Sequence, residues 1–245
     1  MILFNKIAIF TISIMFLNIY GILIGETNVP KSSLNQSELL ENAYDLYLKV
    51  MLDDFFNEWE KELPAFKLEN IKNDTVKTIY EIFNSFYQPF DLTIFGSRLK
   101  NYYNKISYCV IQNTLEYSIV DTIVFNRTLQ WPIISRNIIA DFRPDFLYKN
   151  IKCVFLSSKY ISIINKFICN TSNIKGNFSR EHFISKAIKF DMINDHDILT
   201  DPYCSSMYIN KNFTKALIHC RIVNQWGRVQ LEKTNGNWAI VKSKL

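Results

Sequence analysis

Apolar residues recur at helical spacing in four stretches of the chain. From residue 33 to residue 63 they follow a period of about 3.6, which predicts one long amphipathic helix that begins near a Ser33–Gln36 capping box and ends before Pro64. The same spacing predicts three further helices, the last of them capped by Ser179. They cover residues 75–87, 160–168 and 179–188.

Other stretches are dense in β-branched and aromatic residues, which predicts strands. Asn235-Gly236 separates the last two of them, and this pair tolerates the positive φ angles of a type I′ turn. We therefore expect those two strands to be antiparallel neighbours, with Leu231 opposite Ile240 and Lys233 opposite Trp238. The predicted strands are residues 106–112, 115–125, 133–143, 152–156, 203–210, 214–223, 227–234 and 237–244.

Helices gather early and strands late, without a regular strand-helix-strand alternation. This order predicts an α+β fold, in which N-terminal helices precede a curved antiparallel sheet with packed helices. We divide the chain into residues 1–25, a helical region over 26–105 and a sheet region over 106–245. The last two regions are expected to form one compact unit, because together they are long enough to bury a sizeable core.

The first 25 residues resemble a targeting segment. Lys6 is their only charge, and an apolar run from Ile7 to Ile24 follows it. This layout is typical of an export signal. Two interpretations stay open: cleavage after Gly25, which leaves a secreted or periplasmic protein, and retention as a membrane anchor, because a span needs roughly 18 apolar residues. We expect contact with a membrane only through residues 1–25.

Charge and motifs exclude several classes of function. The chain has 28 basic and 23 acidic residues, which are interleaved and form no basic stripe, so we expect no nucleic-acid partner. We expect no metal and no cofactor, since no two histidines are four residues apart, no C-x-x-C occurs, and the glycines are dispersed. The chain also has no G-x-S-x-G and no phosphate-binding loop, so enzymatic activity is undecided and binding is preferred.

The five cysteines allow two interpretations. A hairpin that turns on residues 211–213 would place Cys204 opposite Cys220, within reach of a disulfide if both side chains share a face. The alternative is that all five cysteines are small buried apolar residues.

Two groups of polar residues are candidates for ligand binding. Arg143 lies late in a mostly apolar stretch and must meet a carboxylate or carbonyl groups if it is buried, and Asp141 shares its strand face. The pair either fixes a loop or binds an anionic group. His219 and Arg221 alternate along a predicted strand, so they either line a concave face or lie on the solvated face while the intervening residues fill the core.

Several segments resemble a group of uncharacterised, exported proteins from Bacteroidota. The residues concerned are ADFRPDF at 140–146, VFLSSKYISIINKFI at 154–168 and KALIHCRIVNQWGRVQLEKTNGNWAIVKSK at 215–244, with FFNEWEKELPAF at 55–66 and FYQPFDL at 86–92. The group has no known activity, so this resemblance implies none.

The C-terminal half is similar to the nuclear transport factor 2-like superfamily, a cystatin-like α+β cone. That resemblance implies a curved antiparallel sheet that wraps a helix and leaves a pocket at its mouth. Trp226-Gly227 stands where the superfamily usually has Gly-Gly after the penultimate bend, so this corner departs from the pattern. Trp226 is a further ligand-binding candidate.

Three functions are consistent with these observations. The preferred one is an exported, non-enzymatic domain that binds a small ligand or a partner protein. The second is a small-molecule enzyme in which Asp141 or His219 transfers a proton and Arg143 or Arg221 orients an anion. The third is a structural surface protein anchored by residues 1–25. An enclosed pocket in which a carboxylate or a histidine converges with an arginine would favour the enzyme, and a filled cone interior would favour binding through the outer surface.

Overall fold

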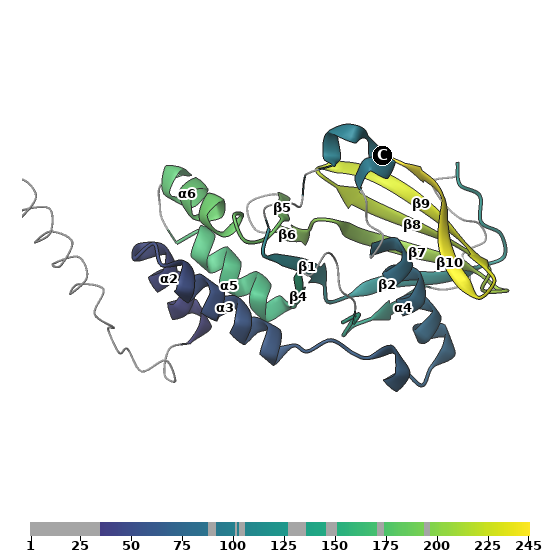
Figure 1. Cartoon of the computed structure of the whole chain (residues 1–245), viewed down its shortest axis with the longest axis horizontal. Helices are drawn as coiled ribbons and strands as arrows, with labels where there is room; N and C mark the ends of the chain where they lie inside the picture. The colour runs from purple at the N-terminus through teal and green to yellow at the C-terminus, as the bar shows by residue number, and fades with distance from the viewer. Residues whose placement is uncertain are drawn as a thin grey trace, which may run out of the picture. The chain divides into compact units, whose positions relative to one another are not determined.

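The computed structural model describes residues 35–87, 92–100, 102, 106–126, 136–145, 151–170, 174–193 and 197–245. The predicted signal or anchor, residues 1–25, and the Ser33 cap lie outside the described residues. None of the helices within the described ranges is long and apolar enough to span a bilayer. Residues 36–245 form one compact unit, with most helices at one end and a large sheet at the other (Figure 1).

The helices confirm the predicted concentration of helical structure near the N-terminus. Three short 3₁₀ segments also lie in the described residues, one of them between two of the long helices and the other two before the first strand. The helices are α2 (Gln36–Asp45), α3 (Lys49–Glu62), α4 (Asp74–Tyr87), α5 (Ser158–Ile168) and α6 (Ile174–Ile184), and the 3₁₀ segments are η1 (Leu68–Asn70), η2 (Leu92–Phe95) and η3 (Ser97–Leu99).

The single long helix predicted before Pro64 is wrong, because the chain breaks between α2 and α3. Tyr47 has a φ of 50°, an uncommon value for a residue with a side chain, and the N–H of Leu48 donates to the carbonyl of Ala43 at 3.1 Å. The break lets both helices pack against α5. Tyr44 of α2 contacts Phe167, and Trp59 of α3 stacks on the α5 residue Tyr160 with ring centroids 4.1 Å apart.

The predicted start of the last helix is also wrong. Helix α6 begins at Ile174, so Ser179 lies inside it, where its hydroxyl donates to the carbonyl of Lys175 at 3.0 Å. A tertiary contact explains why this polar segment is helical. Arg180 is buried, pairs with Glu41 of α2 at 2.6 Å and donates to the carbonyl of Phe167 at 3.1 Å. Such contacts override weak local propensity.

Ten strands form three sheets in the described part of the chain. The largest has six strands in the order β10-β9-β8-β7-β2-β3, a pair joins β1 to β4, and a hairpin joins β5 to β6. The strands are β1 (Tyr108–Gln112), β2 (Leu115–Val120), β3 (Asn137–Ile139), β4 (Lys152–Leu156), β5 (Phe190–Ile193), β6 (Asp197–Thr200), β7 (Tyr203–Asn210), β8 (Lys215–Ile222), β9 (Gln225–Thr234) and β10 (Asn237–Lys244).

The α+β fold is confirmed, but the large sheet is mixed and not wholly antiparallel as expected. Strand β2 pairs with β7 in parallel, and β1 also pairs with β4 in parallel. Strands β5 and β6 were not predicted. The strand predicted over residues 115–125 ends at Val120, and Ile123 and Phe125 then pack on the sheet beside Leu217.

The C-terminal hairpin is confirmed residue by residue. Asn235 and Gly236 have φ angles of 52° and 84°, as a type I′ turn requires. Leu231 lies opposite Ile240, and Lys233 lies opposite Trp238.

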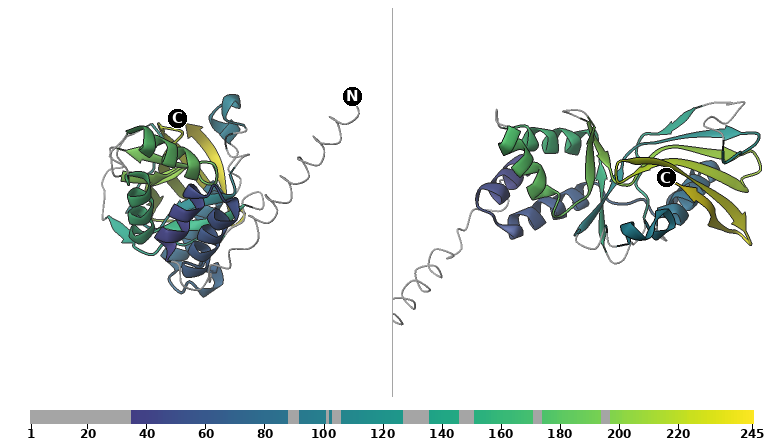
Figure 2. Two further views of the ribbon diagram at one scale, coloured as in Figure 1. Left: turned by 90° about the vertical axis from the view of Figure 1, so that its left-hand side faces the viewer. Right: turned by 90° about the horizontal axis from the view of Figure 1, so that it is seen from above.

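One face of strands β7–β10 is covered by α4 and is filled with side chains. The right-hand view of Figure 2 shows the strands curving past this helix. Phe83 and Phe86 of α4 are fully buried in one cluster with Ile218 and Cys220 of β8. The hollow side of the sheet is therefore a packed core, and a site for a ligand has to be sought on the other face.

Candidate functional site

A pocket of about 260 Å³ lies on the face of the sheet that points away from α4. Strand alternation determines which side chains reach it. The even-numbered residues of β8 from Ala216 to Ile222 are fully buried on the α4 side, so His219 and Arg221 point to the opposite face. The described residues that line the pocket are Ser205, His219, Trp226, Gly227, Arg228, Lys244 and Leu245.

His219 is the polar centre of this pocket. It lies directly opposite Arg228 across β8 and β9, and its ring meets the ring of Tyr208 edge to face at 5.2 Å. Burial, and next the positive charge of Arg228, lowers the pKa of His219 below its ordinary value. This shift disfavours the charged imidazolium form. Its Nε2 atom is buried without a hydrogen-bond partner among the described residues.

Cationic and aromatic side chains surround His219. Arg228 donates from Nη1 to the carbonyl of Phe125 at 2.9 Å, which fixes its guanidinium, and Lys244 lies opposite Arg228 on β10. Trp226 is 58% exposed, and its ring centroid lies 5.9 Å from the guanidinium carbon of Arg221. No Asp or Glu is among the described residues that line the pocket. Such a lining attracts anions.

Gly227 allows β10 to approach β9 closely at this site. A Cβ atom at residue 227 would lie 2.5 Å from the carbonyl oxygen of Lys244 and 2.6 Å from a methyl group of Leu245. Strand β10 also has a register shift between Ile240 and Lys242. A side chain at position 227 would therefore displace the end of β10, which carries Lys244.

The structure brings three of the five sequence candidates together and separates the other two. His219, Arg221 and Trp226 share the pocket face, because Arg221 lies directly opposite Trp226. Arg228, Lys244 and Ser205 were missed. The bend was expected over residues 224–226, whereas the chain turns at Val223-Asn224, with φ angles of 48° and 63°, so Trp226 lies inside β9. A β8–β9 register counted from the turn at Val223-Asn224 places Arg228 opposite His219.

Asp141 and Arg143 lie on the α4 side of the sheet, where each contacts Tyr80 through its backbone. Arg143 Nη2 lies 2.7 Å from Asp141 Oδ2, and Nη1 donates to the carbonyl of Pro64 at 2.8 Å. The guanidinium carbon also lies 3.8 Å from the centre of the Phe66 ring. These contacts hold the segment after α3 against the segment after β3, and they engage the Arg143 head group within the protein.

Cys204 and Cys220 are directly opposite each other in the β7–β8 register. Both are buried thiols on the α4 side of the sheet. Burial raises the pKa of Cys220 to about 12, and it also raises the pKa of Cys204. The Cys204 thiol donates to the carbonyl of Ser206 at 3.9 Å.

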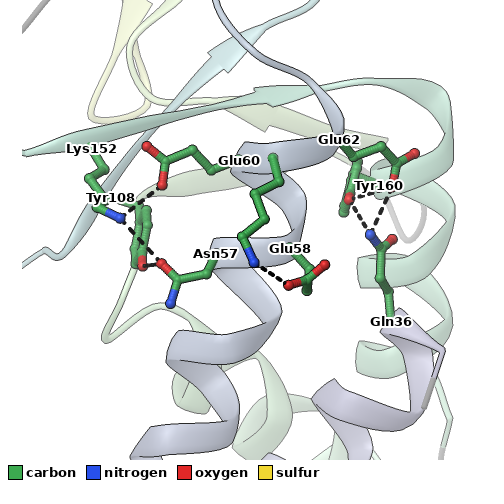
Figure 3. Close-up of polar contacts among 9 residues, drawn as sticks. Gln36, Asn57, Glu58, Glu60, Glu62, Tyr108, Lys152 and Tyr160 are labelled. Atoms are coloured by element: carbon green, nitrogen blue, oxygen red, sulfur yellow. Dashed lines mark hydrogen bonds and ion pairs between the residues drawn. The ribbon is translucent and has the colours of Figure 1, made fainter. Parts of the chain in front are cut away.

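A second polar cluster joins the helices to one another (Figure 3). Glu62 at the end of α3 accepts hydrogen bonds from Lys159 at 2.6 Å, Gln36 at 2.8 Å and Tyr160 at 3.0 Å. Burial alone raises the pKa of Glu62, but the bonds from Lys159, Gln36 and Tyr160 leave that pKa below its ordinary value. The cluster closes α2, α3 and α5 on one another, so we assign it to stability.

Lys152 of β4 makes a similar connection one turn away on α3. Its Nζ lies 2.9 Å from Glu60 and 3.2 Å from Asn57, and Asn57 also accepts from the hydroxyl of Tyr108 at 3.3 Å (Figure 3). Local sequence patterns do not indicate these partners, because they come from three separate elements, α3, β1 and β4.

A second hollow of about 350 Å³ lies between α2 and α6, lined in part by Tyr47, Phe178 and Lys186. Tyr47 is 77% exposed and Phe178 is 69% exposed. Leu46, Leu48 and Val50 are exposed beside Tyr47, so the corner between α2 and α3 is unusually apolar for a surface.

No group of three or more His, Cys, Asp or Glu side chains that would suit a metal ion occurs in the described ranges. Comparison of the chain with protein-family models, with curated proteins and with solved structures found no match.

Proposed function

We propose that this chain is an exported binding domain that takes a small organic anion in the pocket around His219. One observation carries the proposal: His219, whose Nε2 has no hydrogen-bond partner among the described residues, lines one pocket with Arg228, Lys244 and the exposed ring of Trp226. The cations would receive a carboxylate or phosphate group, the indole would cover the apolar body of the ligand, and His219 would accept or donate one hydrogen bond.

Binding is favoured over catalysis for two reasons. Proton transfer at a small molecule usually pairs an acid with a base. Among the described residues that line the pocket, His219 is the only one of a type that commonly acts as an acid or base near neutral pH. The interior between α4 and the sheet is also filled, which leaves the outer face as the place for a ligand.

Calorimetric titration with aromatic carboxylates and phosphomonoesters tests this proposal. Lys244→Gln and Trp226→Ala should each weaken binding about tenfold, the effect of losing one charge-assisted or stacking contact. Lys242→Gln is the matched control, since it removes the same charge from the same strand but lies outside the described lining. Equal losses in Lys244→Gln and Lys242→Gln would show that only general charge attraction is at work.

We propose further that strands β7–β10 and α4 form a nuclear transport factor 2-like cone, and that the chain is related to the uncharacterised Bacteroidota proteins it resembles. The curvature of these strands past α4 supports the first part (Figure 2). An experimental structure superposed on members of that superfamily tests it, and strands that follow a different order would overturn it.

A second candidate function is a surface protein held at the membrane by residues 1–25. The exposed apolar corner at Leu46, Tyr47 and Val50 favours it, because such a corner can rest on lipid beside an anchor. Mass spectrometry of the mature N-terminus decides between the two forms. Retention of residues 1–25 supports anchoring, and a mature chain that begins after Gly25 supports release.

A further inference from the structure

Two cysteines that are far apart in sequence face each other across β1 and β4. Cys109 lies directly opposite Cys153 in the parallel register, so both side chains project from the same side of the pair. Neighbouring strands lie about 4.8 Å apart, and a disulfide joins Cα atoms that are about 4.4–6.8 Å apart. The two thiols also hydrogen-bond to each other. The strand spacing therefore lies within the Cα range of a disulfide.

We propose that Cys109 and Cys153 form a disulfide when the chain folds in an oxidising compartment. The inference rests on the proposed export but is independent of the ligand pocket. The two thiols lose two electrons and two protons to a disulfide oxidant, either glutathione disulfide or an oxidoreductase. One S–S bond forms in the chain, and one S–S bond in the oxidant is reduced to two thiols.

The order of events follows from the exposure of the two residues. Cys153 is partly exposed, whereas Cys109 is buried, so the oxidant reaches Cys153 first and Cys109 resolves the mixed disulfide. The hydrogen bond with Cys109, and next burial, raises the pKa of Cys153. Because the thiolate is the reactive form, oxidation of the folded protein should be slow.

The position of this bond gives it a structural role. Strand β4 belongs to the helical end, since the indole of Trp59 donates to the carbonyl of Phe155 at 2.9 Å. Strand β1 contacts α3 through Tyr108 and also reaches the sheet end, since the amide of Gln112 donates to the carbonyl of Cys204 at 2.7 Å and accepts from its N–H at 2.6 Å. A pair of parallel strands is weak by itself. A Cys109–Cys153 bond would join the two ends covalently.

The pair Cys204 and Cys220 is the internal comparison. These residues also lie opposite each other, but both are less than 3% exposed, and the Cys204 thiol is directed to the carbonyl of Ser206. An oxidant therefore reaches them less readily than it reaches Cys153.

Peptide mapping of the oxidised chain provides the direct test. The full chain is refolded with glutathione and glutathione disulfide, blocked with N-ethylmaleimide and digested without reduction. Mass spectrometry should find a peptide that links Cys109 to Cys153 as the main cross-linked species, with Cys204 and Cys220 alkylated. Alkylation of all five cysteines, or a dominant Cys204–Cys220 link, would overturn the proposal. This measurement uses the wild-type chain, so its result does not depend on whether any cysteine variant folds.

Thermal unfolding gives a second readout. A disulfide that encloses residues 109–153 restricts the unfolded chain, so reduction should lower the Tm by about 5–10 °C. Cys109→Ser with Cys153→Ser should abolish this dependence on reductant, and Cys204→Ser with Cys220→Ser should retain it. The reverse result would contradict the assignment. Anion titration of the oxidised and reduced chains reports separately on the pocket, so the two proposals fail independently.

Discussion

His219 on β8 lies directly opposite Arg228 on β9, and this pairing places a partly buried histidine beside a fixed positive charge. Burial and the Arg228 charge both disfavour the imidazolium form, so the pKa of His219 is lower in the folded chain than in the unfolded chain. An anion bound between His219 and Arg228 would reverse the sign of the local field.

We expect the free energy of unfolding to fall as the pH drops from the unfolded-state pKa of His219 to its lower folded-state pKa. Above the ordinary histidine value of about 6.5, both states hold the neutral ring and the residue has no effect on the pH dependence. Below it, the unfolded chain binds a proton first, and this favours unfolding until the folded-state pKa is also passed. Thermal melts between about pH 5 and pH 7.5 should show this loss in the wild type and less of it in His219→Gln.

His182→Gln serves as the control, because His182 lies on α6, outside the His219 pocket. Addition of a bound anion should also raise the pKa of His219 in an NMR titration. An unchanged titration curve at saturating anion would argue against the proposed pocket.

We expect Gly227→Ala to destroy anion binding and to lower the free energy of unfolding by about 1–3 kcal/mol, the usual effect of overpacking. The added methyl group would collide with the carbonyl oxygen of Lys244 and displace the end of β10. Gly236→Ala is the comparison: no atom lies within 4 Å of its Cβ position, but its φ of 84° makes the substitution unfavourable by about 1 kcal/mol. Calorimetry should find binding intact in Gly236→Ala, whereas binding retained in Gly227→Ala would contradict the pocket geometry.

Arg143 should contribute to stability and not to ligand binding. Arg143→Ala removes the contacts to Asp141, Pro64 and Phe66, so chemical denaturation should show a loss of about 1–3 kcal/mol. Arg143→Lys should recover little of it, because an ammonium group cannot make two separate planar contacts and stack on a ring. If anion affinity fell while stability held, Arg143 would belong to a ligand site after all.

Glu62→Gln should destabilise the chain near neutral pH and make little difference in acid. The hydrogen bonds from Lys159, Gln36 and Tyr160 favour the charged carboxylate, so its contribution is present above the ordinary value of 4.5 and is lost as the pH falls through the lowered folded-state pKa. Thermal melts of wild type and Glu62→Gln should therefore converge in acid. Glu58→Gln on the same helix removes a carboxylate bonded to the exposed Lys61 and should change the melts much less.

Local patterns predicted the parts of this fold that depend on neighbours in sequence. The Asn235-Gly236 turn fixed the register of Leu231 with Ile240, because the turn chemistry and the strand period act within a few residues. The break at Tyr47 was missed because apolar residues continue through it. The packing of both α2 and α3 on α5 explains the break. Local patterns carry no information of that kind.

The candidate site was predicted in part for the same reason. Alternation along one strand grouped His219 with Arg221, but Arg228 and Lys244 depend on the turn at Val223-Asn224, and a β-branched residue at positive φ is a poor signal for a turn. The opposition of Cys109 and Cys153 depends on a parallel pairing across 44 positions of sequence, so the spacing of the cysteines alone could not indicate it.

The side chains of β8 alternate between two faces, and this alternation determines which substitutions each position can accept during evolution. Positions such as Ile218 and Cys220 are limited by volume, since their side chains meet α4 in a filled interior. Under the proposed binding function, the ligand would limit His219 and Arg221 in addition to their contacts with Tyr208 and Asn224. Relatives that have exchanged one ligand for another should therefore differ at alternate positions of this strand and agree at the positions between them.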